Sequence, residues 1–233
     1  MSFHPRINKN RLKGHARRGV LTVSIVMSVP VVVVLAAGRG TRFSGRAHKL
    51  EQNLGTSSVI GTTLRHVLAS RLPMVVVATA AMAETVRDVV AARDIVTLPE
   101  VGSPGPEPLG MGYSIATGVI ARPDAAGWLI LPGDMPMIQP ATLLAVAREL
   151  SQHTVVYAQH RGQRGHPVGF AAELYSELAV LEGDEGARRL VARYPAHGVE
   201  VDDPGVLIDI DTEADLAGLR SRAPAASPLG SLR

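Results

Sequence analysis

The chain has 233 residues, of which 46% are hydrophobic, 19% are charged and only 3% are aromatic, and it contains no cysteine. This hydrophobic content supports a sizeable buried core and argues against a disordered chain. Without cysteine, the chain has no disulfide, zinc–thiolate site, iron–sulfur cluster or cysteine nucleophile. The scarcity of aromatic rings argues against a single-stranded nucleic-acid binder, because such proteins stack bases on aromatic side chains.

The net charge of +3 is distributed unevenly along the chain. Residues 1–26 contain six basic residues and no acidic one, so the remainder has three more acidic than basic residues. The basic charge therefore belongs to one end and does not indicate a domain that binds nucleic acid. We interpret residues 1–26 as a disordered basic extension, 27–220 as a single domain, and the Ala/Pro/Ser-rich residues 221–233 as a flexible tail.

The uncharged run over residues 19–38 has two interpretations. Because it follows Arg17 and Arg18, it is typical of an export signal or a membrane anchor. Alternatively, residues 29–36 form a β-strand that is buried on both faces, since the valines show no alternation and Pro30 suits a strand's first position. We favour the strand, because the glycine-rich segment that follows has a chemical role only if the strand is folded. We accordingly expect a cytoplasmic protein that does not associate with membranes.

Strand and helix patterns then alternate. The first half is expected to contain strands at 29–36, 73–78, 95–98 and 127–131, and helices at 62–70, 80–93, 113–121 and 140–150. Four prolines and two glycines predict a loop over 99–109. The second half is expected to contain strands at 155–158, 166–170 and 206–210, and helices at 171–181, 185–194 and 212–219. This order predicts an α/β fold of three layers with an open, mostly parallel sheet.

A candidate phosphate-binding segment and a candidate metal ligand lie where the predicted strands end, which is where such sheets bind ligands. The segment LAAGRGTR, residues 35–42, leaves the first strand, so its glycines let backbone N–H groups approach phosphates while Arg39, Arg42 and Lys49 add positive charge. It matches neither the Walker loop nor the dinucleotide fingerprint. Asp134 follows the strand at 127–131 and is either a turn cap or a Mg²⁺ ligand.

A second carboxylate is expected from the last predicted strand. Asp209 and Asp211 lie two residues apart and so share one face of a strand. Either of them could complete a metal site with Asp134, or cap the helix that follows.

An ordered set of motifs carries a family resemblance. It comprises LAAGRGTR and Lys49, followed by GMGYS at 110–114, LPGDMP at 131–136, RGHPVGF at 164–170, GDEGARRLV at 183–191 and DIDTEADL at 209–216. Over residues 30–220 the chain resembles the MobA-like nucleotidyltransferases, most closely the molybdenum cofactor cytidylyltransferase branch. The resemblance implies a Rossmann-like nucleotidyltransferase fold and Mg²⁺-dependent transfer of a nucleotidyl group from a nucleoside triphosphate, with release of pyrophosphate.

The resemblance also assigns roles to individual residues. It implies that Arg42, Lys49 and Asp134 are catalytic, and that Asp134 binds the metal together with Asp209 or Asp211. It implies a nucleotide-binding set of Leu35, Ala36, Ala37, Gly38, Arg39, Gly40, Gly110, Met111, Gly112 and Ser114. His166, Asp184 and Arg188 would face the acceptor.

The expected substrates follow from the same resemblance. Ala37 favours CTP over GTP, because the guanylyl branch has glycine at this position. The implied acceptor is molybdopterin, and a molybdenum hydroxylase is a candidate partner. The alternatives are guanylyl transfer, transfer to a sugar phosphate, a MobA-like oxidoreductase, and a chaperone that inserts the cofactor.

Overall fold

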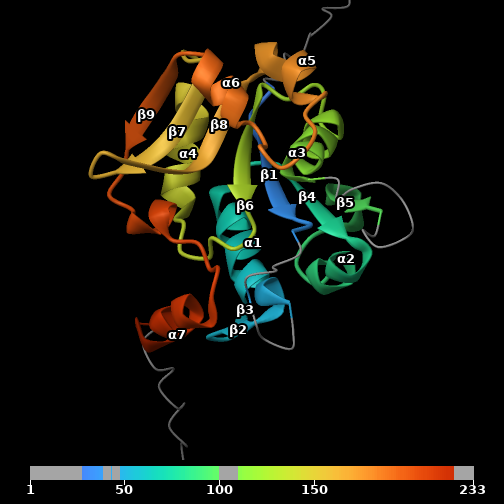
Figure 1. The fold of residues 1–233 in the computed structure, drawn as a ribbon, viewed down its shortest axis with the longest axis vertical. Coiled ribbons are helices and arrows are strands. Elements are labelled where there is room, and N and C mark those ends of the chain that lie inside the picture. The colour runs from blue at the N-terminus through green and yellow to red at the C-terminus, as the bar shows by residue number, and fades with distance from the viewer. Residues whose placement is uncertain (1–27, 39–42, 44–47, 100–109, 223–233) are drawn as a thin grey trace, which may run out of the picture.

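The computed structural model of the chain describes residues 28–38, 43, 48–99 and 110–222. Its centre is a seven-stranded sheet with the strand order β5-β4-β1-β6-β8-β7-β9. The strands are β1 (Val31–Ala36), β4 (Met74–Thr79), β5 (Ile95–Leu98), β6 (Gly127–Pro132), β7 (Val155–His160), β8 (Gln163–Ala171) and β9 (Ala196–Glu200). Within this sheet only β8 runs against the other six strands, so the predicted α/β fold with a mostly parallel sheet is confirmed (Figure 1).

The expected valine strand is β1, and it lies between β4 and β6. Its side chains alternate between two cores: Val32 and Val34 lie in one, Val31 and Val33 in the other. All four are at most 4% exposed. A central strand has no solvent-facing side, which is why its sequence shows no polar alternation.

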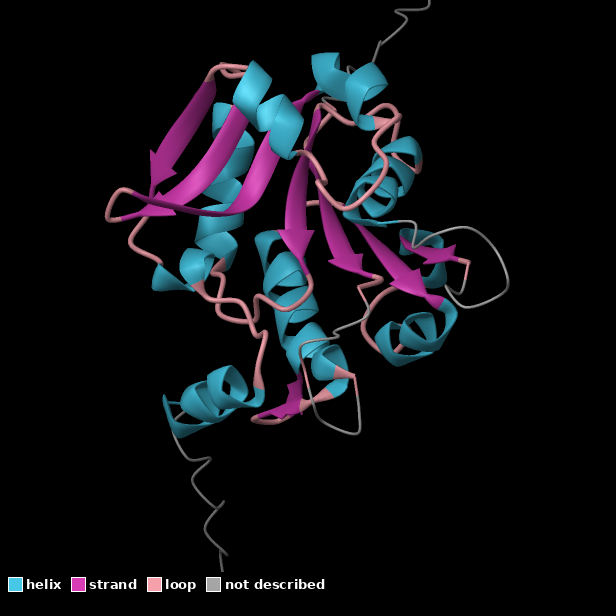
Figure 2. Cartoon of the chain, in the orientation of Figure 1, coloured by secondary structure: helices cyan, strands magenta, loops and turns pink. Residues whose placement is uncertain are grey.

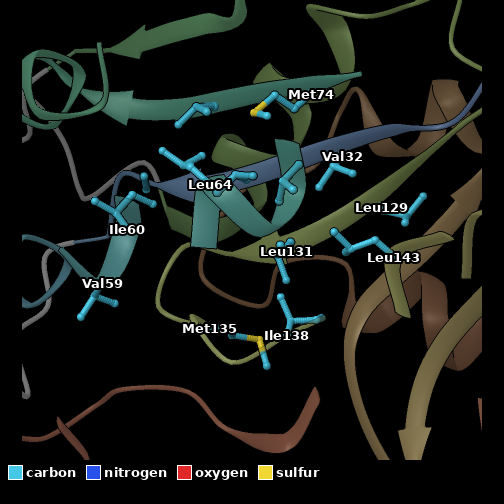
Figure 3. Close-up of a cluster of buried hydrophobic side chains, with 14 of the residues drawn as sticks. Val32, Val59, Ile60, Leu64, Met74, Leu129, Leu131, Met135, Ile138 and Leu143 are labelled. Atoms are coloured by element: carbon cyan, nitrogen blue, oxygen red, sulfur yellow. The ribbon is translucent and has the colours of Figure 1, made fainter. Parts of the chain in front are cut away.

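Helices cover both faces of the sheet and complete the three layers (Figure 2). One face packs against α1 (Val59–Ser70), α2 (Ala80–Val86) and α4 (Pro140–Glu149). The opposite face packs against α3 (Gly110–Ile120), α5 (Tyr175–Leu178) and α6 (Arg188–Arg193). In the first of these cores, Leu64 of α1 and Leu143 of α4 point toward Val32 and Leu129 of the sheet (Figure 3).

Shorter elements join these layers. They are the β2–β3 hairpin (Asn53–Leu54 and Ser57–Ser58), the 3₁₀ turns η1 (Lys49–Glu51), η2 (Ala92–Asp94), η3 (Ala172–Leu174) and η4 (Pro204–Leu207), and the last helix α7 (Glu213–Arg222). Thr212 caps α7, because its Oγ1 accepts a hydrogen bond from the N–H of Asp215 at 3.2 Å. The Arg220 side chain of α7 donates to the carbonyl of Asn53 at 2.6 and 2.9 Å, which fastens the helix to the hairpin.

One predicted strand is wrong, and one strand of the sheet was not predicted. The strand expected at 206–210 is wrong: Val206 and Leu207 belong to η4, and residues 208–211 form irregular backbone. The buried Asp203 carboxylate fixes this turn by accepting hydrogen bonds from the N–H of Gly205 at 2.9 Å, the N–H of Gln139 at 2.8 Å and Oγ1 of Thr142 at 2.6 Å. Strand β9, which pairs in parallel with β7, was not predicted because none of its residues is buried and its sequence has no hydrophobic alternation.

Other elements differ only in length. The helix expected at 80–93 ends as α2 at Val86, and the helices expected at 171–181 and 185–194 shorten to η3 with α5 and to α6. Helices α1 and α3 each begin three residues before the expected position. The expected extension 1–26 and most of the expected tail 221–233 lie outside the described residues, although α7 continues to Arg222. Among the helices of the described ranges, none has both the length and the apolar character needed to span a membrane.

We predict that Asp203→Ala destabilises the fold. The change leaves three hydrogen-bond donors without their acceptor, two of them in buried bonds, and a single hydrogen bond to a charged group is worth roughly 1.5–3 kcal/mol. The free energy of unfolding, measured by urea titration, should therefore fall by at least about this amount. Asp202→Ala, at the exposed neighbouring position, is the matched control. Equal stability of the two variants would contradict the structural role given to Asp203.

Candidate functional site

The candidate site begins where β1 and β6 end side by side. The N–H of Gly133 donates to the carbonyl of Leu35 at 2.9 Å, and Oγ1 of Thr63 donates to the carbonyl of Gly133 at 2.9 Å. A Cβ at Gly133 would lie 2.9 Å from that Leu35 oxygen, so this crossing requires glycine. The arrangement fixes Asp134 at the carboxyl edge of the sheet, directly beside Ala37 and Gly38, which leave β1.

The segment that contains Asp209 and Asp211 runs alongside Asp134. The N–H of Ile210 donates to the carbonyl of Asp134 at 3.0 Å, and the Ile210 side chain is fully buried. Although these residues do not form a strand, this bond holds them next to β6. Asp209 is exposed and Asp211 is half-buried.

Lys49 joins the two carboxylate-bearing segments. Its Nζ lies 2.6 Å from Oδ2 of Asp134 and 3.0 Å from Oδ1 of Asp211. Burial alone would lower the pKa of Lys49, but the hydrogen bonds and negative charges of both aspartates outweigh this effect and raise the pKa above its ordinary value. Lys49 is therefore a fixed cation at neutral pH.

His48 positions Lys49 and was missed in the sequence. Its Nδ1 accepts a hydrogen bond from the N–H of Leu50 at 3.2 Å, so its Nε2 is the nitrogen that donates to the carbonyl of Gly38 at 2.8 Å. This imidazole therefore connects the start of η1 to the segment that leaves β1. In the sequence, the feature that could have identified His48 was its position directly before Lys49.

One oxygen of Asp134 has no partner in the part of the chain that the structure describes. Among the described residues, Oδ1 of Asp134 is buried and makes no hydrogen bond, while Oδ2 contacts Lys49. A buried carboxylate oxygen without a donor is costly unless a cation or another ligand satisfies it. Two aspartates also carry one negative charge more than Lys49 neutralises. All-oxygen donors with excess negative charge fit a hard divalent cation such as Mg²⁺ or Mn²⁺.

His166 lies close enough to the carboxylates to feel their charge. Burial lowers the pKa of His166, and the positive charge of Arg164 acts in the same direction, whereas the negative charges of Asp134 and Asp209 oppose the shift. The residue before it, Gly165, packs against Val206, whose carbonyl oxygen would lie 2.1 Å from an added Cβ. His166 is thus held near the carboxylates in its neutral form.

The glycines of the GMGYS segment have a packing role. The N–H of Gly112 donates to the carbonyl of Gly183 at 2.8 Å, and Gly110 has a φ of +72° that favours glycine. Within the same segment Met111 is 52% exposed, whereas Ser114 is buried and donates to the carbonyl of Gly110 at 3.4 Å. The segment is therefore placed against residues 182–183, and its contact with a nucleotide base stays a prediction.

The remaining predicted residues are distributed as follows. Leu35, Ala36, Ala37 and Gly38 lie at the carboxyl end of β1 beside Asp134, whereas Arg39, Gly40 and Arg42 lie outside the described residues. Asp184 and Arg188 are exposed and follow the segment that covers Gly110 and Gly112. Among the described residues, no hydrogen bond or ion pair joins Asp184 or Arg188 to Lys49 or Asp134, so their acceptor role stays a prediction.

Comparison with known proteins supports the MobA-like family resemblance over most of the chain. The family model described as the MobA-like NTP transferase domain matches residues 32–199. Purine catabolism protein PucB of Bacillus subtilis is 28% identical over 200 residues, which cover 77% of this chain and 90% of PucB. The bifunctional protein GlmU of Alkalilimnicola ehrlichii is 33% identical over 121 residues, which cover 51% of this chain. The match spans only 24% of that GlmU.

Solved structures match more completely. Rv0371c from Mycobacterium tuberculosis aligns with a TM-score of 0.70 and 28% identity, over 83% of this chain and 98% of that one. The same protein was also solved in complex with manganese, and that structure aligns with a TM-score of 0.67 over the same shares of the two chains.

We predict that His166 makes the fold sensitive to acid. Because folding lowers the pKa of His166 below its ordinary value of 6.5, the unfolded chain binds the proton more tightly. This stabilising contribution is present above about pH 6.5 and is lost as the pH falls from there toward the pKa of the folded protein. His166→Gln should therefore lose less thermal stability than the wild type between pH 7.5 and 5.5. His197→Gln, which removes an exposed imidazole, is the control; an equal loss in all three proteins would contradict the prediction.

Proposed function

Because this chain belongs to the MobA-like NTP transferase domain family, we propose that it transfers a nucleotidyl group from a nucleoside triphosphate to a phosphorylated acceptor. The observation that carries the proposal is the contact of Lys49 with Asp134 and Asp211, next to a buried Asp134 oxygen that has no partner among the described residues. Among the described residues, the site contains one cationic side chain and two carboxylates, and the Asp134 oxygen without a partner can bind a second cation.

The second cation in this proposal is Mg²⁺. Asp134 and Asp211 would hold it, and the exposed Asp209, two residues before Asp211, would complete the site. The manganese complex of the related Rv0371c supports a divalent metal in this family. When bound, the metal supplies positive charge that binds triphosphate oxygens and stabilises the leaving pyrophosphate.

The chain's own residues position the substrates. The backbone of residues 37–40 and the side chain of Arg42 would bind the triphosphate, and the permanently protonated Lys49 would balance its charge. An acceptor phosphate oxygen then forms a bond to the α-phosphorus, the bond from that phosphorus to the β-bridging oxygen breaks, and pyrophosphate leaves with the electron pair. Such transfer needs alignment and fixed positive charge but no covalent enzyme intermediate. His166, beside the carboxylates, would orient the acceptor, and Asp184 and Arg188 would bind its outer part.

We assign CTP and molybdopterin as the specific substrates. The support is the ordered motif set and Ala37, whose half-buried side chain packs at the end of β1. A molybdenum hydroxylase would then receive the finished cofactor. Transfer of a guanylyl group, or transfer to a sugar phosphate, is the second candidate, because the sequence Leu-Ala-Ala-Gly at 35–38 also occurs in sugar nucleotidyltransferases.

The deciding experiment measures pyrophosphate released from each of the four nucleoside triphosphates, with Mg²⁺ and with or without molybdopterin. Release from CTP that depends on molybdopterin is the expected result. Release only with a sugar phosphate or only from GTP would favour the second candidate. No release with any acceptor would contradict nucleotidyl transfer and favour an oxidoreductase or a chaperone on the same fold.

We predict that Asp134→Ala reduces metal-dependent pyrophosphate release by at least about 100-fold, the typical cost of removing one charge-stabilising group from a transfer site. The fold should persist, because the Asp134 backbone, which holds Ile210, is unchanged. Circular dichroism checks the fold, and Asp88→Ala, which removes an exposed carboxylate elsewhere, is the matched control. Activity near that of the wild type in Asp134→Ala would remove the metal assignment.

We predict that CTP has a higher kcat/KM than GTP and that Ala37→Gly narrows the difference without reversing it. A purine is wider than a pyrimidine, so removing a methyl group near the base gives it room. One such packing difference typically changes discrimination by about 10–200-fold. Competition assays with both nucleotides measure the ratio directly. Equal kcat/KM values in the wild type would refute the cytidylyl assignment.

A further inference from the structure

Three metal-binding side chains meet outside the nucleotide site. They are Glu149 at the end of α4, His153 in the turn that follows, and His197 in β9. One carboxylate oxygen and one ring nitrogen of each histidine all lie within 4.8 Å of one another. None of these residues takes part in the contacts of Lys49, Asp134 or Asp211 described above.

Local backbone geometry places Glu149 and His153 together. The N–H of His153 donates to the carbonyl of Glu149 at 3.0 Å, so the chain makes one more helical turn beyond α4. Residues four apart on such a turn share a face. Nε2 of His153 accordingly lies 3.7 Å from Oε2 of Glu149.

The sheet register brings His197 to the same place. In the parallel pairing of β7 with β9, His197 lies opposite Val156, so both side chains point to the same face of the sheet. Val156 is buried in the core that includes Leu143 and Val146 of α4, and this face is therefore the one that α4 covers. β9 forms the outer edge of the sheet, which leaves His197 exposed to solvent (Figure 1).

The two imidazoles are parallel and in contact. Their ring centres are 4.0 Å apart with an interplanar angle of 7°. In a tetrahedral zinc site with bonds of about 2.0–2.1 Å, donor atoms lie roughly 3.4 Å from one another. The donor atoms lie within 4.8 Å of one another, so zinc binding requires them to approach by up to about 1.4 Å and the stacked rings to turn toward the ion. Side-chain rotation can supply this change because the Glu149 and His153 side chains are 36% and 37% exposed.

The electrostatic setting also favours a cation. The cluster lies at the C-terminal end of α4, and the negative end of a helix dipole attracts positive charge. Glu149 adds a formal negative charge. Two imidazole nitrogens and one carboxylate oxygen are the donor set of open zinc sites, with water in the fourth position.

We propose that Glu149, His153 and His197 form a second metal site that binds Zn²⁺ and joins α4 to the edge strand β9. Its nitrogen donors separate it from the all-oxygen set of Asp134 and Asp211, because imidazole prefers zinc-class ions whereas Mg²⁺ prefers carboxylate and water. Within the described sheet β9 pairs only with β7, so a bound ion would add a second attachment for this strand.

The test is calorimetric titration of the full chain with Zn²⁺ in excess Mg²⁺, comparing the wild type with His153→Gln and His197→Gln. Losing even an outer partner of a metal site typically lowers affinity about 10–100-fold, so losing a ligand should lower it at least tenfold. His66→Gln removes an imidazole from α1 and should bind Zn²⁺ like the wild type. If His153→Gln fails to fold, His197→Gln, at an exposed edge position, decides the result.

Hydrogen exchange gives a second measurement. Zn²⁺ should slow amide exchange in residues 196–200 of the wild type and leave it unchanged in His197→Gln, while pyrophosphate release from the nucleotide substrate stays the same in both proteins. Zn²⁺ affinity in His197→Gln equal to that of the wild type, or no Zn²⁺ binding by the wild type, would overturn the proposal.

Discussion

The contact of one ammonium group with two carboxylates determines the shape of the candidate site. Lys49 binds Asp134 from the end of β6 and Asp211 from the segment before α7. These three residues come from distant parts of the sequence, and like-charged carboxylates repel one another unless a cation lies between them. Partial burial strengthens the attraction, which is the reason that the pKa of Lys49 rises despite desolvation. Lys49 therefore offsets the repulsion between the two carboxylates.

The backbone around this contact is equally constrained. Gly133 brings β6 against Leu35 of β1, and the Ile210 N–H holds the third segment to Asp134. His48 fastens the lysine-bearing turn to Gly38. Since backbone hydrogen bonds and close packing fix these positions, the site is organised before any ligand arrives. Such pre-organisation suits a reaction that proceeds by alignment and charge stabilisation.

The sequence was informative wherever burial imposed a pattern. The valines of β1 and the carboxylate that follows β6 were predicted because central parallel strands are hydrophobic throughout and bind ligands at their carboxyl ends. β9 was missed because an exposed edge strand needs no such pattern. The strand expected at 206–210 was wrong because Val206 is buried in a turn, which Asp203 fixes through contacts with residues more than 60 positions away. The sequence left Asp209 and Asp211 equivalent, and only the three-dimensional contact with Lys49 distinguishes them.

We propose that Asp134 and Asp211 hold a divalent metal beside Lys49. The most direct measurement titrates Mn²⁺ into the wild type and an Asp134→Asn/Asp211→Asn double variant, both with a non-hydrolysable CTP analogue, and follows free Mn²⁺ by electron paramagnetic resonance. We expect the wild type to bind Mn²⁺ at this site and the double variant to lose this binding while remaining folded. Equal Mn²⁺ binding by the two proteins would contradict it.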